Sequence, residues 1–170
     1  MATPGDDWTC CPRCRAALAR VVRSGIPRPT CPACGLVFFA NPGVGAACVI
    51  RNAAGRVLLV QRGAGHWGAG LWCFPCGFVE WGEDVRATAA REALEEAGIE
   101  VRIGEPVQVA SNFHEPDKPT VGIWFAATLI SADPPVAGDD AVAVGWFEPG
   151  APPPLAFPTD AALLARLARG

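Results

Sequence analysis

Six acidic residues fall within the 23 positions from 77 to 99, which read GFVEWGEDVRATAAREALEEAGI. In a helix of about 3.6 residues per turn, Glu92 and Glu96 lie one turn apart and Glu95 lies beside them. Carboxylates this close repel one another, so a solvated surface helix gains nothing from the arrangement. A hard divalent cation such as Mg²⁺ would make it favourable. The opposite arc, with Ala90, Ala93, Leu94 and Ala97, is expected to face the core.

The plain alternative for this segment is an amphipathic helix with an acidic, solvated face. That alternative gives no reason for Gly77 or Arg91. The segment instead resembles the Nudix box, in which a glycine, a glutamate and the run Arg-Glu-aliphatic-x-Glu-Glu-x-Gly-aliphatic stand at fixed spacing. The matching residues are Gly77, Glu83, Arg91, Glu92, Ala93, Glu95, Glu96, Gly98 and Ile99. Only Ala93 departs from the pattern, since it is small for an aliphatic position.

The resemblance implies a pyrophosphatase that cleaves a nucleoside diphosphate linked to another group, with Mg²⁺ or Mn²⁺ as the catalytic metal. Its catalytic and metal-binding residues would be Glu92, Glu95 and Glu96 as ligands or base, with Cys76 as a ligand through its backbone carbonyl. The resemblance also implies that Glu83 supports the site and that Arg91 orients the glutamates by a charge-assisted hydrogen bond.

Many members of that family have glycine or alanine where Cys76 stands. Cys73 and Cys76 form a Cys-x-x-Cys pair, which could be a redox pair or part of a second metal site. No further cysteine pair remains to complete such a site, so two buried thiols in a tight turn are the favoured interpretation. A backbone carbonyl ligand does not depend on its side chain, so the expected metal site is unaffected.

Two other Cys-x-x-Cys pairs, Cys11 with Cys14 and Cys31 with Cys34, are separated by 16 residues. Four thiolates at this spacing predict a structural Zn²⁺ site, because the intervening stretch is too short and polar to form a core. Disulfides or free thiols are the alternatives, and Cys10 could substitute for Cys11. Residues 1–40 are therefore expected to form a zinc ribbon used for docking or stability.

The chain has 170 residues, enough for one domain with a core and a small module. It has no apolar run near roughly 18 residues and no signal-peptide pattern, which predicts no membrane partner and a cytoplasmic location. A net charge of −3 argues against nucleic-acid binding by the whole chain. Related domains often dimerise, so the resemblance suggests a homodimer.

Strand patterns are interleaved with two helical patterns after residue 41. The expected strands are 44–50, 56–60, 105–111, 121–130 and 141–147, and the expected helices are 84–97 and one running to 168. Thr159 or Asp160 is expected to cap the last helix. This order indicates an α/β fold with a mixed sheet between helices. By resemblance, residues 41–170 form a Nudix αβα sandwich that follows the small zinc-ribbon module.

Four residues outside the box are candidates for substrate binding: Arg62, Trp67, His114 and Glu115. Trp67 lies in a glycine-rich loop and could stack on a base. His114 and Glu115 lie in a loop beyond the box, where some relatives carry an additional catalytic glutamate. Ordinary roles of polar loop residues are an equal alternative for His114 and Glu115.

A zinc ribbon followed by a Nudix domain resembles NADH pyrophosphatases and a group of FAD- and ADP-ribose-type pyrophosphatases. The NADH enzymes carry a Ser-Gln-Pro-Trp-Pro-Phe-Pro-like motif after the box, where this chain has VQVASNF at 107–113. ADP-ribose or an FAD-like dinucleotide is therefore the favoured nucleotide substrate. The alternatives are an NADH pyrophosphatase, a non-catalytic nucleotide-sensing regulator, and an enzyme acting on RNA ends or the nucleotide pool.

Overall fold

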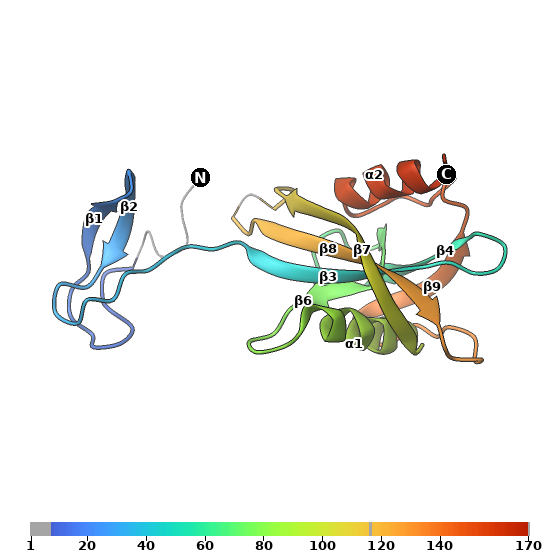
Figure 1. Ribbon diagram of the computed structural model, residues 1–170, viewed down its shortest axis with the longest axis horizontal. Coiled ribbons are helices and arrows are strands. Elements are labelled where there is room, and N and C mark those ends of the chain that lie inside the picture. Colours follow the sequence, from blue (N-terminus) through green and yellow to red (C-terminus); the bar gives the residue numbers. More distant parts are fainter. Residues whose placement is uncertain (1–7, 116, 170) are drawn as a thin grey trace. The chain divides into compact units, whose positions relative to one another are not determined.

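The strands of the computed structural model, which describes residues 8–115 and 117–169, form three sheets (Figure 1). The chain divides into two units: residues up to Pro42 together with 115–118, and residues 43–114 together with those from 119 onward. Within the described residues the two helices are 13 and 10 residues long, and neither is long and apolar enough to cross a membrane.

The smaller unit is built on an antiparallel hairpin of β1 (Ala19–Arg23) and β2 (Ile26–Thr30). Ser24 and Gly25, with φ values of 50° and 80°, form the two-residue turn that such hairpins favour. Among residues 8–42 the buried side chains are those of Cys11, Pro29, Thr30 and Cys31, so two of the four are cysteines. A unit with so little apolar core must be held by other contacts.

The larger unit contains a four-stranded sheet, in the order β6-β3-β8-β7, and a three-stranded sheet, in the order β5-β4-β9. The pairing of β3 with β8 is parallel and the other pairings are antiparallel, so the first sheet is mixed, as predicted. The elements of this unit are β3 (Gly43–Ile50), β4 (Val57–Arg62), β5 (Trp72–Cys73), β6 (Cys76–Phe78), α1 (Val85–Ala97), β7 (Val101–Asn112), β8 (Thr120–Leu129), β9 (Ala141–Phe147) and α2 (Pro158–Leu167).

Strand β3 is buried on both faces. Ala46 and Cys48 pack in a cluster with alanines of α1, while Ala47 and Val49 pack with leucines of α2. Successive side chains of a strand point to opposite faces, so the two helices cover opposite sides of the strands. Figure 1 shows α1 and α2 on these two sides. The predicted αβα sandwich is confirmed.

The ends of α1 follow from two residues of the sequence. Asp84 caps its start, because the carboxylate accepts hydrogen bonds from the amides of Arg86 at 2.8 Å and Ala87 at 3.3 Å. Gly98 ends it in the left-handed conformation, with a φ of 65°. Both ends lie where the sequence predicts them.

The buried face of α1 matches the prediction only in part: Ala93 and Ala97 are buried as expected. Leu94, expected in the core, is 52% exposed, whereas Glu92 and Glu96 lie on the buried face beside Ala89 and Ala93. The prediction placed the core opposite the acids, as in an ordinary amphipathic helix. Alanine side chains are small, so this face of the helix approaches the strands closely and the neighbouring glutamates are covered with it.

The start of α2 also differs from the prediction. The helix begins at Pro158, whose fixed φ suits the first helical position, and no side chain caps it. The Thr159 hydroxyl donates instead to Asn112 Oδ1 at 2.8 Å. Asp160 points into the core, where burial raises the pKa of its carboxyl to about 7. The hydrogen bonds from Trp124 and the Phe74 amide act in the opposite direction and lower this pKa.

Candidate active site and metal-binding residues

Two buried glutamates project from the face of α1 that packs against the strands. Glu92 is 8% exposed and Glu96 is 3% exposed. Burial, together with the Cys73 thiol and the Asp140 carboxylate nearby, raises the pKa of Glu96 to about 10, and burial also raises the pKa of Glu92. A divalent cation would favour the charged forms of both groups, and carboxylate oxygens are the donors that Mg²⁺ prefers. The donor set therefore fits Mg²⁺ or Mn²⁺.

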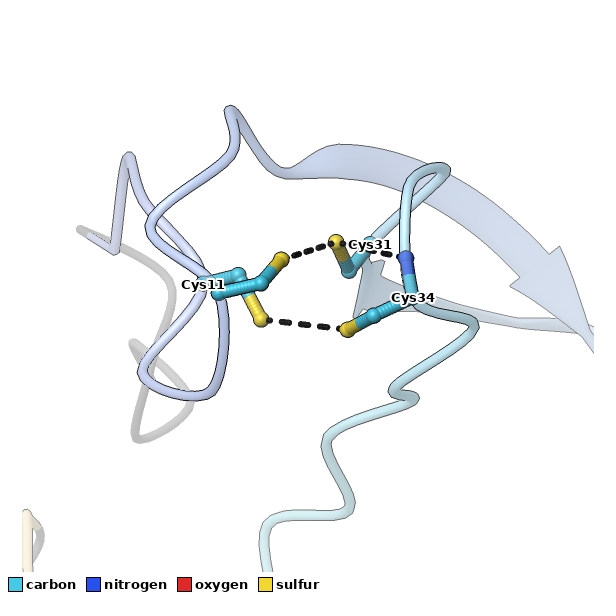
Figure 2. A group of neighbouring side chains, drawn as sticks. Cys11, Cys31 and Cys34 are labelled. Carbon is cyan, nitrogen blue, oxygen red and sulfur yellow. Dashed lines mark hydrogen bonds between the residues drawn. The ribbon is translucent and has the colours of Figure 1, made fainter.

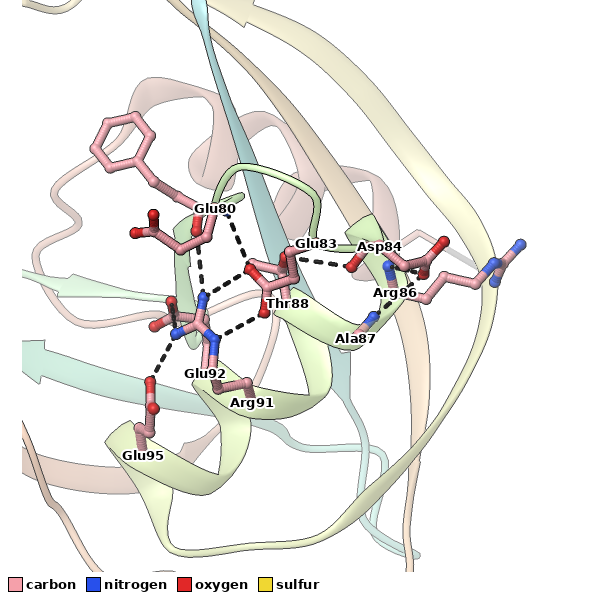
Figure 3. A network of polar contacts seen from close by, with 10 residues as sticks. Glu80, Glu83, Asp84, Arg86, Ala87, Thr88, Arg91, Glu92 and Glu95 are labelled. Carbon is pink, nitrogen blue, oxygen red and sulfur yellow. Dashed lines mark hydrogen bonds and ion pairs between the residues drawn. The ribbon is translucent and has the colours of Figure 1, made fainter.

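Arg91 contacts three glutamates of the box at once (Figure 3). One guanidinium nitrogen donates to Glu92 Oε1 and to Glu95 Oε2, both at 2.7 Å, and Nε donates to Glu83 Oε1 at 2.9 Å. The hydrogen bonds from Arg91 and from the Glu80 amide lower the pKa of Glu83 to about 2. Glu95 stays largely exposed, so the three glutamates predicted on one arc divide into two buried groups and one at the surface.

The connection from β5 to β6 lies against the buried glutamates. The Cys76 amide donates to Glu96 Oε2 at 2.8 Å. A Cβ added at Gly77 would stand 2.0 Å from Glu92 Oε1, so this position accepts only glycine while Glu92 keeps its place. The sequence motif alone gives no such contact; it comes from the pairing of β6 with β3.

The thiols of Cys73 and Cys76 lie beside each other next to this connection. Cys73 is fully buried, and its sulfur is 3.9 Å from a guanidinium nitrogen of Arg62. The hydrogen bond to Cys73 and burial raise the pKa of Cys76 well above the usual thiol value. Of the two thiols predicted to be buried, the structure buries Cys73 and leaves Cys76 half-buried.

Sequence reasoning missed Asp140, which lies in the turn before β9. Its carboxylate is hydrogen-bonded to the Glu96 side chain and stands 3.2 Å from His66 Nδ1. The loop that carries it is docked on the end of α1, where Val136 N donates to Ala97 O at 2.9 Å and Gly138 N donates to Glu96 O at 3.2 Å. The only signal in the sequence was an acidic pair just before a predicted strand, which says nothing of its proximity to α1.

Three aromatic rings gather near Arg62. The Trp67 ring centroid lies 4.5 Å from that of His114 and 5.7 Å from that of Phe157, onto which it stacks. The Arg62 guanidinium stands 5.2 Å from the Phe157 centroid, and Arg62 Nε donates to Trp67 O at 2.8 Å. The structure thus brings together three of the predicted substrate-binding residues and adds Phe157, which the sequence analysis missed.

Glu115 does not join this group. It belongs to the smaller unit, where its carboxylate lies 3.4 Å from Lys118 Nζ. Its catalytic role stays a prediction.

The four predicted zinc ligands lie together in the smaller unit. The sulfurs of Cys11, Cys14, Cys31 and Cys34 all lie within 4.8 Å of one another, with contacts of 3.6 Å and 3.5 Å across the two pairs (Figure 2). A tetrahedral site with zinc–sulfur bonds of about 2.3 Å has sulfur–sulfur edges of about 3.8 Å, so the cluster fits Zn²⁺. Hydrogen bonding from the Cys34 amide, opposed by burial, lowers the pKa of Cys31 to about 6.

The two cysteine pairs have the same backbone geometry. Arg15 N donates to Cys11 O at 2.8 Å and Gly35 N donates to Cys31 O at 3.0 Å, and the residue after each second cysteine has a positive φ. Cys10 is exposed and outside the sulfur cluster. The sulfur group therefore includes Cys11 and not Cys10, in agreement with the Cys-x-x-Cys spacing on which the sequence analysis relied.

Replacing Gly77 by alanine is expected to lower hydrolytic activity by about 10²-fold, because the new Cβ displaces Glu92 by an ångström or more. Gly150→Ala is the matched control, since its Cβ would meet Ala168 at an ordinary 3.7 Å. Steady-state kinetics of both variants provide the measurement. Equal activity of the two variants would show that the position of Glu92 does not matter for the reaction.

Comparison with known proteins places this geometry in a family. The model of the NUDIX domain matches residues 41–167. A crystal structure of a NUDIX hydrolase from Nitrosomonas europaea superposes with a TM-score of 0.80 and 30% identity, over 95% of this chain and 90% of that one.

Two relatives of known activity are similar in sequence. An ADP-ribose pyrophosphatase from Methanocaldococcus jannaschii is 30% identical over 71% of this chain and 70% of its own length. The NAD-capped RNA hydrolase ndx-9 of Caenorhabditis elegans is 28% identical over 81% of this chain, which spans only 36% of that protein. The glutamate-bearing helix, the close-fitting Gly77 and these similarities lead to one conclusion: the chain belongs to the NUDIX family.

Proposed function

We propose that the larger unit is a Mg²⁺- or Mn²⁺-dependent pyrophosphatase that hydrolyses a nucleoside diphosphate linked to another moiety. The observation that carries the proposal is the pair of buried glutamates on α1, of which Glu92 is bound by Arg91 and Glu96 by the Cys76 amide. Such a group is unfavourable in itself, because burial and mutual repulsion both oppose ionisation. It becomes favourable when a divalent cation shares the oxygens.

A bound divalent cation supplies charge neutralisation of the pyrophosphate and activation of the attacking water. In the proposed site, Glu92 and Glu96 would hold the cation with the Cys76 carbonyl, and Asp140 would add a carboxylate that the sequence did not predict. Arg91 orients Glu92 and binds Glu95 through the same guanidinium nitrogen. Water adds to one phosphorus, the bridging oxygen leaves with the other phosphate, and a carboxylate of the site accepts the proton of the water.

The substrate that we favour is ADP-ribose or an FAD-like dinucleotide. Trp67, 40% exposed, and His114 offer ring faces on which a nucleobase can stack, and base–aromatic stacking does not need a particular base. Arg62 supports this group by bonding the Trp67 carbonyl. The similarity to an ADP-ribose pyrophosphatase over most of both chains supports this substrate class.

An NAD-linked substrate is the second candidate. It is favoured by the similarity to the NAD-capped RNA hydrolase, although the motif typical of NADH enzymes is missing after the box. A regulator that binds nucleotides without hydrolysing them would not need the complete set of box glutamates that this chain keeps. We also infer that the cysteine cluster of the smaller unit binds one structural Zn²⁺.

With a substrate panel, ADP-ribose or FAD is expected to exceed NADH and dGTP by about tenfold or more in kcat/KM, which corresponds to about 1.4 kcal/mol of transition-state binding. A two-part substrate can use contacts on both halves to position the bridge. Products should be AMP and the phosphorylated remainder, identified by chromatography. If NADH or a triphosphate had the highest kcat/KM, the choice of ADP-ribose or FAD would be wrong. If no compound were hydrolysed, the non-catalytic regulator would be favoured.

A further inference from the structure

A third buried carboxylate lies apart from the two on α1. Asp160, in the first turn of α2, is 1% exposed and packs within the apolar cluster that contains Leu163 and Leu164. Its Oδ1 accepts a hydrogen bond from Trp124 Nε1 at 2.8 Å, and its Oδ2 accepts one from the Phe74 amide at 3.2 Å. Burying a carboxylate is unfavourable, and an apolar side chain at this position of α2 would destabilise the folded protein less.

The Phe74 amide belongs to the connection that lies against the metal-binding acids. β5 ends at Cys73 and β6 begins at Cys76, so Phe74 lies between the two short strands rather than in either of them. Residues 74 to 76 are each hydrogen-bonded to a different element. Phe74 N donates to Asp160 of α2, Cys48 N of β3 donates to Pro75 O at 2.9 Å, and Cys76 N donates to Glu96 of α1.

The segment that follows has little tolerance for movement. Gly77 lies so close to Glu92 that a single added carbon would overlap the carboxylate. The segment also contains Cys76, whose carbonyl is the backbone ligand that we expect for the cation. Mg²⁺ and Mn²⁺ bind best with near-octahedral geometry, so a small shift of this segment changes the affinity of the site.

We propose that Asp160 is a positioning residue for the metal site: by holding the Phe74 amide from the α2 side, it fixes segment 74–77 against Glu92 and Glu96. This rests on the proposed metal site but not on any particular substrate. Asp160 touches neither substrate nor cation. Its effect is transmitted along the backbone, in the way that groups behind metal ligands tune affinity.

The test compares Asp160→Ala with Leu163→Ala. Both residues are buried on α2, so both substitutions loosen the packing of this helix, but only the first removes the acceptor of the Phe74 amide. In the substrate-free protein, Mn²⁺ binding measured by calorimetry or electron paramagnetic resonance should weaken about tenfold or more in Asp160→Ala and remain near the wild-type value in Leu163→Ala. Asp160→Asn, which keeps one acceptor, should lie between Asp160→Ala and the wild type.

Amide hydrogen exchange of the metal-free protein gives a readout that does not depend on the cation. Protection of the Cys76 amide from exchange should fall in Asp160→Ala and persist in Leu163→Ala. Each variant is measured at the same number of degrees below its own melting temperature. Equal effects of the two variants on Mn²⁺ affinity and on this amide, or no effect of either, would overturn the positioning role. Failure of the wild type to bind Mn²⁺ in a Glu96-dependent way would instead sink the proposed metal site, while the exchange result would still report on Asp160.

Discussion

Substitution of Glu96 by glutamine is expected to lower kcat at saturating Mg²⁺ by about 10²-fold or more, without destabilising the metal-free protein. Glutamine keeps an oxygen that can accept from the Cys76 amide but lacks the charge that a hard cation needs. Its amide can also donate to Asp140, whose carboxylate opposes the ionisation of Glu96 in the wild type. The variant should therefore fold normally and fail in catalysis. Glu92→Gln should behave similarly.

The difference in stability between the metal-free variant and the metal-free wild type should depend on pH in a defined direction. Glu96 has a folded-state pKa of about 10, above its ordinary value of 4.5, so the folded protein keeps a proton that the unfolded chain releases. The stability that this group contributes is complete below pH 4.5 and is lost as the pH rises toward 10. Glutamine does not titrate. Glu96→Gln should therefore gain stability relative to wild type as the pH rises from about 6 to about 9.

Steady-state kinetics and urea denaturation in the presence of a chelator provide the two measurements. Glu100→Gln is the matched control, because Glu100 is exposed and lies just outside the box. It should leave kcat and the pH dependence of stability unchanged. Near-normal turnover of Glu96→Gln would refute the assigned role of this carboxylate.

Substitution of Cys31 by serine is expected to remove about one zinc per chain and to unfold the smaller unit. Cys31 is buried, and its sulfur lies in the group of four that could hold a metal ion. The hairpin of β1 and β2 buries only Pro29 and Thr30, which is too little to replace that contribution. Metal analysis of the purified protein and nuclear magnetic resonance signals from residues 19–30 would record the two losses.

Cys10→Ser provides the control for this experiment. Cys10 is adjacent to Cys11 in the chain but exposed and outside the sulfur group, so its replacement should leave zinc content and folding unchanged. Zinc retained by Cys31→Ser, or lost from Cys10→Ser, would contradict the assignment of ligands.

Features with a local cause could be predicted from the sequence. The ends of α1 follow from Asp84 and Gly98, and strand β9 follows from its own pattern of residues, so neither depends on distant parts of the chain. The clustering of Cys11 with Cys34 is likewise encoded in spacing, because the intervening hairpin is short.

Strand β7 is longer than expected. Pro106 interrupts the pattern of residues, but the strand continues past it through register shifts.

Features set by contacts between distant segments could not be predicted. Asp140 lies near Glu96 because a loop about 40 residues further along the chain docks on the end of α1, which no local pattern records. Phe157 joins Trp67, and Asp160 joins Phe74, only through the packing of α2. The burial of Glu92 and Glu96 and the exposure of Leu94 were not predicted for the same reason. Helical periodicity says which residues share a face but not what covers that face.

The docking of the Asp140 loop also determines where the chain can change length. Val136 and Gly138 fix this loop by bonding the last carbonyls of α1, whereas residues 132–134 before them are exposed. Extra residues inserted at 132–134 would be absorbed there, and new chain ends opened at that point would leave Asp140 in place. A single residue inserted between Gly138 and Asp140 would instead separate the carboxylate from Glu96, even though it adds less to the chain.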